Sequence, residues 1–101
     1  MAKAKAGGRR GPVLRTKVTV ANRRGLHARA AAKFVKTVAA HDAEVRVTLK
    51  GNTVSGASIM GLMMLGAGAG SALVLRATGT AAAAVLVALQ ALIAARFEED
   101  E

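Results

Sequence analysis

The sequence predicts an α+β fold: an open-faced β-sandwich in which a four-stranded antiparallel sheet carries three helices on one face, in the order βαββαβα. Segments with strand-like alternation and segments with helical periodicity follow one another along the chain in that order. The short links between neighbouring segments favour antiparallel pairing. Apolar and polar residues alternate within the strands, which indicates that one face of the sheet is covered and the other exposed.

Length and composition are those of one domain, because 101 residues with 52% apolar content can bury a single core. Aromatic residues are scarce, and Phe34 and Phe97 are both expected inside that core. We predict a flexible basic arm over residues 1–12, a domain over residues 13–97, and a solvated acidic tail over residues 98–101. The arm lacks the apolar stretch of a secretory signal, and no segment is expected to cross a membrane. The absence of cysteine excludes disulfides and zinc–thiolate sites.

The net charge of +9 implies acidic partners, which include an acidic protein face, a phosphorylated group or nucleic acid. Proteins that bind single-stranded nucleic acid usually add aromatic side chains that stack on the bases. Aromatic residues make up only 2% of this chain. Nucleic acid is therefore the less favoured partner.

The first half of the domain is predicted to hold a strand, a turn and a helix. Residues Val13–Ala21 alternate and are rich in β-branched side chains, which is typical of a strand. Residues Asn22–Gly25 follow as a turn. From Ala28 to Ala40, apolar residues recur at helical spacing and mark a buried face, and cations at the same spacing mark a second stripe.

The middle of the domain is predicted to hold a hairpin and a short helix. Residues Glu44–Lys50 alternate as a half-exposed strand. A tight turn at Gly51-Asn52 then returns the chain antiparallel over residues Thr53–Gly56. Ser58 is expected to cap a short helix over Ile59–Leu65.

The last part of the domain is predicted to be a loop, a strand and a long helix. Residues Gly66–Gly70 lack the lysine and the following helix of a phosphate-binding P-loop, so they are interpreted as a connector. Residues Ser71–Thr78 have the pattern of a strand. Thr80 is then expected to cap an alanine-rich helix that runs to about Arg96.

A histidine stands at the start of the first predicted helix, within Gly25-Leu26-His27-Ala28-Arg29. Helix starts leave about four backbone N–H groups without intrahelical partners and carry a partial positive charge. With the Arg29 guanidinium, the backbone amides of Ala28, Arg29 and Ala30 suit a dianionic phosphoryl group. Imidazole is nucleophilic near neutral pH, so we predict that His27 accepts the phosphoryl group and that Arg29 stabilises it. No metal site or cofactor is predicted.

The short helix is apolar almost all round, so its apolar side chains cannot all face inward. Exposed methionine suits a surface that meets several partners. The cationic stripe of the first helix is expected to steer acidic partners towards this surface. We expect partner docking at Lys33, Lys36, Ile59, Met60 and Met63.

The chain carries two separate motifs. The first is Gly25-Leu26-His27-Ala28-Arg29 followed by Ala32-Lys33-Phe34-Val35, and the second is Ser58-Ile59-Met60-Gly61 with Leu65-Gly66. They resemble the motifs of HPr, the family of histidine phosphocarriers of the phosphoenolpyruvate-dependent phosphotransferase system. The likeness covers roughly Leu14 to Arg96, with both motifs at the family's separation. Either motif alone would be suggestive, and the pair in this element order is specific.

The resemblance implies a covalent carrier and not a turnover enzyme. Its His27 would accept a phosphoryl group on Nδ1 from phosphorylated enzyme I and pass it to an EIIA domain, for sugar uptake or its regulation. Ser58 matches the serine that HPr kinase/phosphorylase modifies in some members of the family. The implied protein is a cytoplasmic monomer.

One residue departs from the family pattern, because Ala30 stands where the motif usually has proline. Alanine is a good helix former, so the helix should survive, with one more backbone donor near the phosphate. Two alternatives stay open. One is a carrier of the regulatory, nitrogen-related phosphotransferase chain, and the other is a small basic nucleic-acid-binding protein whose binding would fall steeply with salt.

Overall fold

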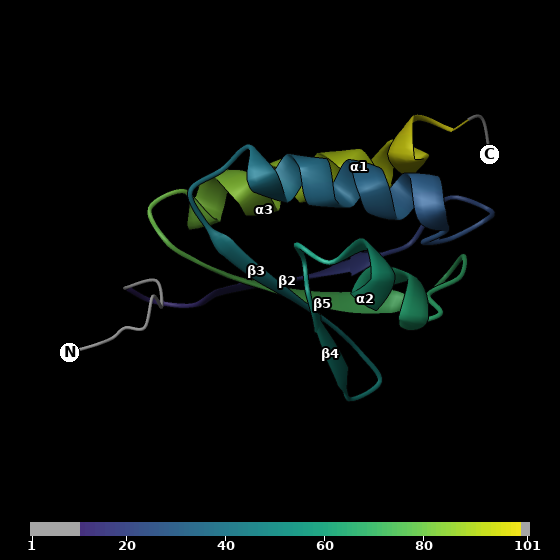
Figure 1. Ribbon diagram of the computed structural model, residues 1–101, viewed down its shortest axis with the longest axis horizontal. Helices are drawn as coiled ribbons and strands as arrows, with labels where there is room; N and C mark the ends of the chain where they lie inside the picture. Colours follow the sequence, from purple (N-terminus) through teal and green to yellow (C-terminus); the bar gives the residue numbers. More distant parts are fainter. Residues whose placement is uncertain (1–10, 100–101) are drawn as a thin grey trace.

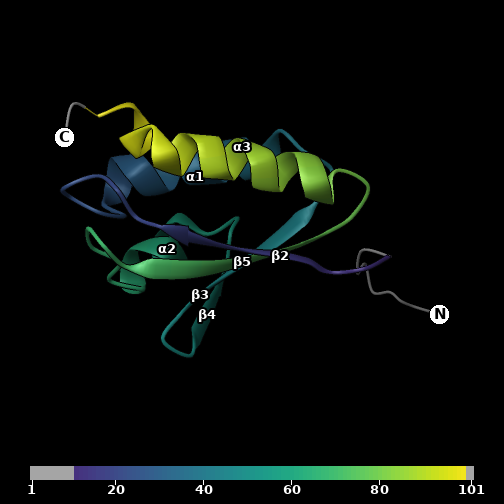
Figure 2. The same ribbon diagram turned by 180° about the vertical axis from the view of Figure 1, so that it is seen from behind.

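The computed structural model describes residues 11–99, so all of the predicted basic arm except Gly11 and Pro12 lies outside the described residues. The elements are β2 (Leu14–Thr19), α1 (Ala28–Ala39), β3 (Glu44–Leu49), β4 (Asn52–Ser55), α2 (Ile59–Met64), β5 (Ala72–Thr78), α3 (Ala82–Ala94) and the short turn η1 (Arg96–Glu98). The strands form one antiparallel sheet in the order β2-β5-β3-β4. The predicted fold is confirmed, with the helices layered against one face of the sheet (Figures 1 and 2).

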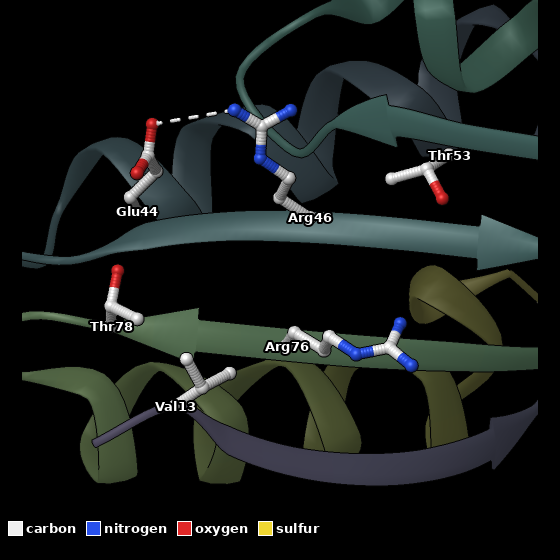
Figure 3. Close-up of a pocket in the computed structure, with 6 residues that line it drawn as sticks. All are labelled: Val13, Glu44, Arg46, Thr53, Arg76 and Thr78. Carbon is white, nitrogen blue, oxygen red and sulfur yellow. Dashed lines mark ion pairs between the residues drawn. The ribbon is translucent and has the colours of Figure 1, made fainter. Parts of the chain in front are cut away.

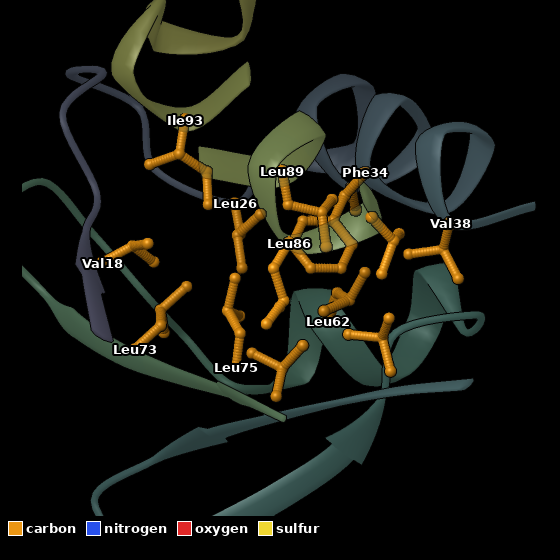
Figure 4. Close-up of a cluster of buried hydrophobic side chains, with 14 of the residues drawn as sticks. Val18, Leu26, Phe34, Val38, Leu62, Leu73, Leu75, Leu86, Leu89 and Ile93 are labelled. Atoms are coloured by element: carbon orange, nitrogen blue, oxygen red, sulfur yellow. The ribbon is translucent and has the colours of Figure 1, made fainter. Parts of the chain in front are cut away.

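The core lies between the sheet and the helices. In β3, Val45, Val47 and Leu49 are buried and alternate with exposed or half-buried polar residues. The helices contribute fully buried side chains such as Phe34 of α1 and Leu62 of α2, as Figure 4 shows. Phe97 is fully buried too, so both phenylalanines are in the core as predicted. None of the helices in residues 11–99 has the length and hydropathy needed to span a bilayer.

The hairpin between β3 and β4 turns one residue earlier than predicted. Lys50 and Gly51 both have positive φ, 50° and 84°. Two-residue hairpin loops of type I′ require positive φ at both central residues. Asn52, predicted in the turn, pairs with Leu49 in the ladder instead.

The last helix is shorter than predicted at both ends. Its N-cap is Ala81, which makes no side-chain capping bond. The hydroxyl of Thr80, the predicted cap, donates to the Asp42 carboxylate, and the backbone of Ala81 donates to the Asp42 carbonyl. These bonds fasten the start of α3 to the loop that follows α1.

Three successive residues with positive φ follow the end of α3. The φ angles are 57° at Arg96, 53° at Phe97 and 65° at Glu98. Left-handed backbone costs an L-residue roughly 1–2 kcal/mol, and burial of the Phe97 side chain offsets part of that cost. The turn places η1 beside the start of α1 (Figure 1).

Candidate functional site

The loop before α1 is anchored to the loop before β5. Gly25 has a φ of 69°, and an ideal Cβ at this position would lie 2.2 Å from the carbonyl oxygen of Ala67. The next residue, Leu26, is buried, and its backbone N–H donates to that same oxygen at 2.9 Å. Glycine is therefore required here by both backbone conformation and space. The close approach fixes the direction in which the chain enters His27.

His27 is the N-cap of α1, with extended backbone (φ −73°, ψ 177°). Its Nδ1 accepts a long hydrogen bond from the Arg29 backbone N–H, at 3.3 Å. Nδ1 can accept only when it carries no proton. The structure thus brings the imidazole and Arg29 together at a helix start.

The first turn of α1 is favourable for an anion. It contains no acidic residue, and the Arg29 side chain is exposed. The N–H groups of Ala28, Arg29 and Ala30 belong to the set that lacks intrahelical partners at any helix start. The Ala30 side chain is fully buried in the core, so alanine fills this place without reaching the surface.

A glutamate from the far end of the chain contacts His27. The imidazole Nε2 is hydrogen-bonded to Oε2 of Glu99, and the two side chains are 15% and 14% exposed. Nδ2 of the fully buried Asn22 donates to Glu99 Oε1 at 3.1 Å and to the Gly25 carbonyl at 2.8 Å. An ionised carboxylate only accepts hydrogen bonds, so Nε2 is the donor in this contact. Nδ1, which accepts from the Arg29 N–H, is then the nitrogen with the lone pair.

The surroundings of Glu99 keep it ionised. Burial raises the pKa of Glu99, but hydrogen bonds from His27 and Asn22, together with favourable electrostatic interactions with His27 and Arg24, outweigh it. The net shift of the Glu99 pKa is downward. The carboxylate is therefore available to the imidazole over the whole neutral range.

Lys33 is held by the same C-terminal segment. Its Nζ donates to the Phe97 carbonyl at 2.7 Å and lies 3.3 Å from Oε1 of Glu98. Of the predicted solvated tail, Glu98 is 72% exposed, whereas the Glu99 side chain is only 14% exposed and packs against His27. No motif pointed to Asn22 or Glu99, because Glu99 is 72 residues from His27 and its contacts depend on the left-handed turn.

The second helix presents the exposed apolar surface that was predicted. Ile59, Met60 and Met63 are 42%, 67% and 41% exposed, and Met64, which was not predicted, is 78% exposed. Lys36 is also exposed. The five residues predicted to dock partners are Lys33, Lys36, Ile59, Met60 and Met63; they are called the docking surface below.

Ser58 caps α2 as predicted. Its Oγ accepts from the Gly61 backbone N–H at 2.9 Å. The hydroxyl is therefore at a helix start beside the exposed side chains of Ile59 and Met60. Within residues 11–99, no group of three His, Cys, Asp or Glu side chains is arranged to hold a metal ion.

Three comparisons place this chain among known proteins. The family model described as "PTS HPr component phosphorylation site" matches residues 14–95. The chain is 42% identical over 89 residues to "Phosphocarrier protein HPr" of Cupriavidus necator, covering 88% of this chain and 100% of the relative. It is 41% identical over 86 residues to "Phosphocarrier protein NPr" of Shewanella violacea, covering 85% and 94%. The crystal structure of HPr from Thermoanaerobacter tengcongensis superposes with a TM-score of 0.83 at 34% identity, covering 87% and 99%.

Proposed function

Because the chain belongs to the HPr family and is a phosphocarrier of the phosphotransferase system, we propose that His27 carries the phosphoryl group on Nδ1. The observation that carries this proposal is the arrangement of the imidazole. Nδ1 lies at the start of α1, where its lone pair accepts a long hydrogen bond from the Arg29 N–H, while Nε2 is hydrogen-bonded to Glu99. The nucleophilic nitrogen is thus the one nearest to the helix amides and to Arg29.

In the proposed transfer, the Nδ1 lone pair attacks the phosphorus atom of phosphorylated enzyme I. The bond between phosphorus and the donor atom breaks in line, and its electron pair leaves with the donor. The Arg29 backbone N–H, which donates to Nδ1 before the transfer, then donates to a phosphoryl oxygen. The Arg29 guanidinium and the neighbouring backbone amides stabilise the remaining negative charge of the phosphoryl group. Transfer to an EIIA domain is the same step in reverse, with the EIIA nucleophile attacking phosphorus.

The docking surface is proposed to receive both partners in the cytoplasm. Exposed methionines adapt to partners of different shape, and three of the four methionines of this chain lie on α2. The exposed Lys36 would steer acidic partners towards the apolar residues. Lys33 would have to exchange its contacts with the C-terminal segment for contacts with a partner.

Ser58 is the proposed site of regulatory phosphorylation by an HPr kinase/phosphorylase. A phosphate at a helix start is locally tolerated because the helix amides and dipole favour negative charge. Phosphorylation of Ser58 would therefore change partner binding more than the helix itself, because it places negative charge beside the exposed side chains of Ile59 and Met60. An acidic partner would then be repelled from the docking surface.

A regulatory carrier is the second candidate, and the observation that favours it is the similarity to the NPr protein of Shewanella violacea. The two candidates use the same residues and differ in the acceptor. Incubation of the phosphorylated chain with a sugar-permease EIIA domain and with a regulatory EIIA domain, both from the same organism, distinguishes them. The faster acceptor identifies the role.

The experiment that tests the carrier itself is incubation with enzyme I and phosphoenolpyruvate, followed by intact-protein mass spectrometry. We expect one phosphoryl adduct that acid removes, because the N–P bond of phosphohistidine is labile. His27→Ala should abolish the adduct. His41→Ala, which removes the other histidine of the chain, should leave it. An adduct that persists in His27→Ala would refute the assignment of the carrier residue.

A further inference from the structure

The uncovered face of the sheet carries a row of arginines. Arg76 of β5 is the direct cross-strand partner of Arg15 of β2 on one side and of Arg46 of β3 on the other. Residues paired in this way point to the same face of a sheet. Their neighbours in sequence, such as Leu14, Leu75 and Val47, belong to the core face, so the three arginines lie on the face opposite the helices.

This row is electrostatically unfavourable without a counter-ion. Neighbouring strands are about 4.8 Å apart, and like charges placed directly opposite one another destabilise a sheet. Lys17 adds a fourth cation to the same face of β2. The acid of this face on β3 is Glu44, whose Oε2 lies 4.0 Å from Arg46 Nη2 at a largely exposed position. One exposed carboxylate leaves most of the positive charge unbalanced.

Two of these arginines, Arg46 and Arg76, border an open hollow of about 350 Å³. It is lined by Val13, Glu44, Arg46, Thr53, Arg76 and Thr78, which Figure 3 shows on one face of β3, β4 and β5 and at the start of β2. Small-molecule sites begin at about 300 Å³. The hollow is therefore large enough for a small ligand.

Arg76 is held in place before any ligand arrives. Its Nη1 donates to Thr48 Oγ1 at 3.3 Å, and Thr48 is hydrogen-bonded to Thr53 through their hydroxyls at 2.7 Å. The Arg76 side chain is half-buried. A guanidinium with one edge already fixed loses less conformational freedom when its remaining N–H groups bind an anion.

The chemistry of the hollow favours clustered phosphates over a nucleic-acid chain. Guanidinium groups bind phosphate oxygens in bidentate fashion, and several guanidinium groups match several negative charges on one molecule. Chains of nucleotides bind open sheets through aromatic stacking, but both aromatic residues of this protein are buried in the core. Val13, 58% exposed at the rim, offers an apolar contact beside the charges.

From this juxtaposition we propose that the open face of the sheet is a second anion site, separate from His27, which binds small molecules carrying a diphosphate or triphosphate group. Arg46 and Arg76 line the hollow and bind the phosphates, and the Thr78 side chain lines it as well. Arg15, the cross-strand partner of Arg76, adds positive charge beside them. No covalent step is involved. The site is independent of phosphoryl transfer, because its residues project from the other face of the sheet.

The test is titration of the full chain with inorganic pyrophosphate at low ionic strength, followed by calorimetry and by amide NMR shifts. We expect shifts concentrated in β2, β3 and β5, and an affinity that falls as sodium chloride is added. Arg76→Gln should weaken binding about tenfold or more, since a charge-assisted contact is lost. Arg46→Gln, at an exposed position in the lining of the same hollow, gives the same test if Arg76→Gln proves unstable.

The matched control is Arg29→Gln, which removes the same charge at the start of α1. The proposal predicts that the pyrophosphate-induced amide shifts in β2, β3 and β5 persist in this variant. Binding lost in Arg29→Gln and kept in Arg76→Gln would place the anion at His27 and overturn the proposal. Equal weakening in both variants would show a non-specific response to net charge and would overturn it as well. Binding of a short oligonucleotide to this face, without binding of pyrophosphate, would also overturn the proposal.

Discussion

Substitution of Gly25 by alanine tests the claim that close backbone contact positions His27. The new methyl group would meet the Ala67 carbonyl oxygen at 2.2 Å and the Gly68 Cα at 2.8 Å. Both are backbone atoms, so no side chain can rotate away. Ala67 is 5% exposed, which leaves its segment little room to retreat.

The size of the effect can be worked out with Gly66→Ala as reference. Gly66 has nearly the same φ, 70° against 69°, but nothing lies within 4 Å of its ideal Cβ. In both variants alanine must adopt left-handed backbone, which costs roughly 1–2 kcal/mol of stability. Because alanine also lowers the conformational entropy of the unfolded chain, about 0.4–1 kcal/mol of that loss is recovered. Gly25→Ala adds overpacking of about 1–3 kcal/mol. It also strains the bond from Leu26 N–H to the Ala67 carbonyl, worth about 1 kcal/mol.

We therefore expect Gly25→Ala to lower the free energy of unfolding by about 3 kcal/mol and Gly66→Ala by about 1 kcal/mol. Urea unfolding followed by circular dichroism measures both. The rate of phosphorylation by enzyme I should fall in Gly25→Ala and stay near the wild-type value in Gly66→Ala. Equal losses of stability in the two variants would refute the reasoning, because only the contact with Ala67 distinguishes them.

Three further substitutions test other parts of the molecule. Ser58→Ala should cost about 1 kcal/mol, since Gly61 N–H loses its acceptor; denaturant melts measure it, and Ser58→Asn should recover most of the loss. Phe97→Ala should cost about 3–5 kcal/mol because the ring is fully buried, and a loss below 1 kcal/mol would contradict the packing of η1. Met60→Gln should change stability by less than about 0.5 kcal/mol, yet weaken enzyme I binding several-fold in calorimetry, and unchanged binding would remove Met60 from the docking surface.

The parts of the fold that the sequence predicts are those encoded by local pattern. The alternation of Val45, Val47 and Leu49 determines which face of β3 is buried, because successive strand residues point to opposite faces. The first helix was predicted over residues 28–40 and is observed over Ala28–Ala39, since its apolar periodicity is regular. The cap at Ser58 was predictable from the type and position of one residue.

The C-terminal segment could not be predicted because its conformation depends on contacts between distant residues. Arg96, Phe97 and Glu98 adopt positive φ although none is glycine or asparagine, the residues that usually indicate this conformation. Their turn is supported by burial of Phe97 and by a bond from Lys33, 64 residues away. Long-range contacts of this kind leave no pattern in a short window of sequence. The contact of Glu99 with His27 depends on the same turn, so it was not predicted either.

The contact between Glu99 and His27 is expected to affect the rate at which His27 is phosphorylated. Phosphorylation of Nδ1 increases the positive character of the imidazole, and a carboxylate on Nε2 stabilises that charge more strongly than a neutral amide. Glu99→Gln should therefore slow phosphorylation by enzyme I about tenfold, the equivalent of about 1.4 kcal/mol. Glu98→Gln is the matched control, because the Glu98 side chain is 72% exposed and pairs with Lys33, a pair worth at most about 1 kcal/mol. Faster phosphorylation in Glu99→Gln would mean that the carboxylate shields His27 instead of assisting it.

The pH dependence of stability distinguishes a specific role of the Glu99 charge from a general effect of the substitution. The pKa of Glu99 is lower in the folded protein than its ordinary value of 4.5, so the folded state favours the ionised carboxyl. Its contribution to stability is fully present above pH 4.5 and is lost as the pH falls through the lowered pKa. The wild type should accordingly be more stable than Glu99→Gln at neutral pH, and the difference should shrink below pH 4.5. A difference that stayed constant under acid would show that the carboxylate charge does not hold the segment against His27.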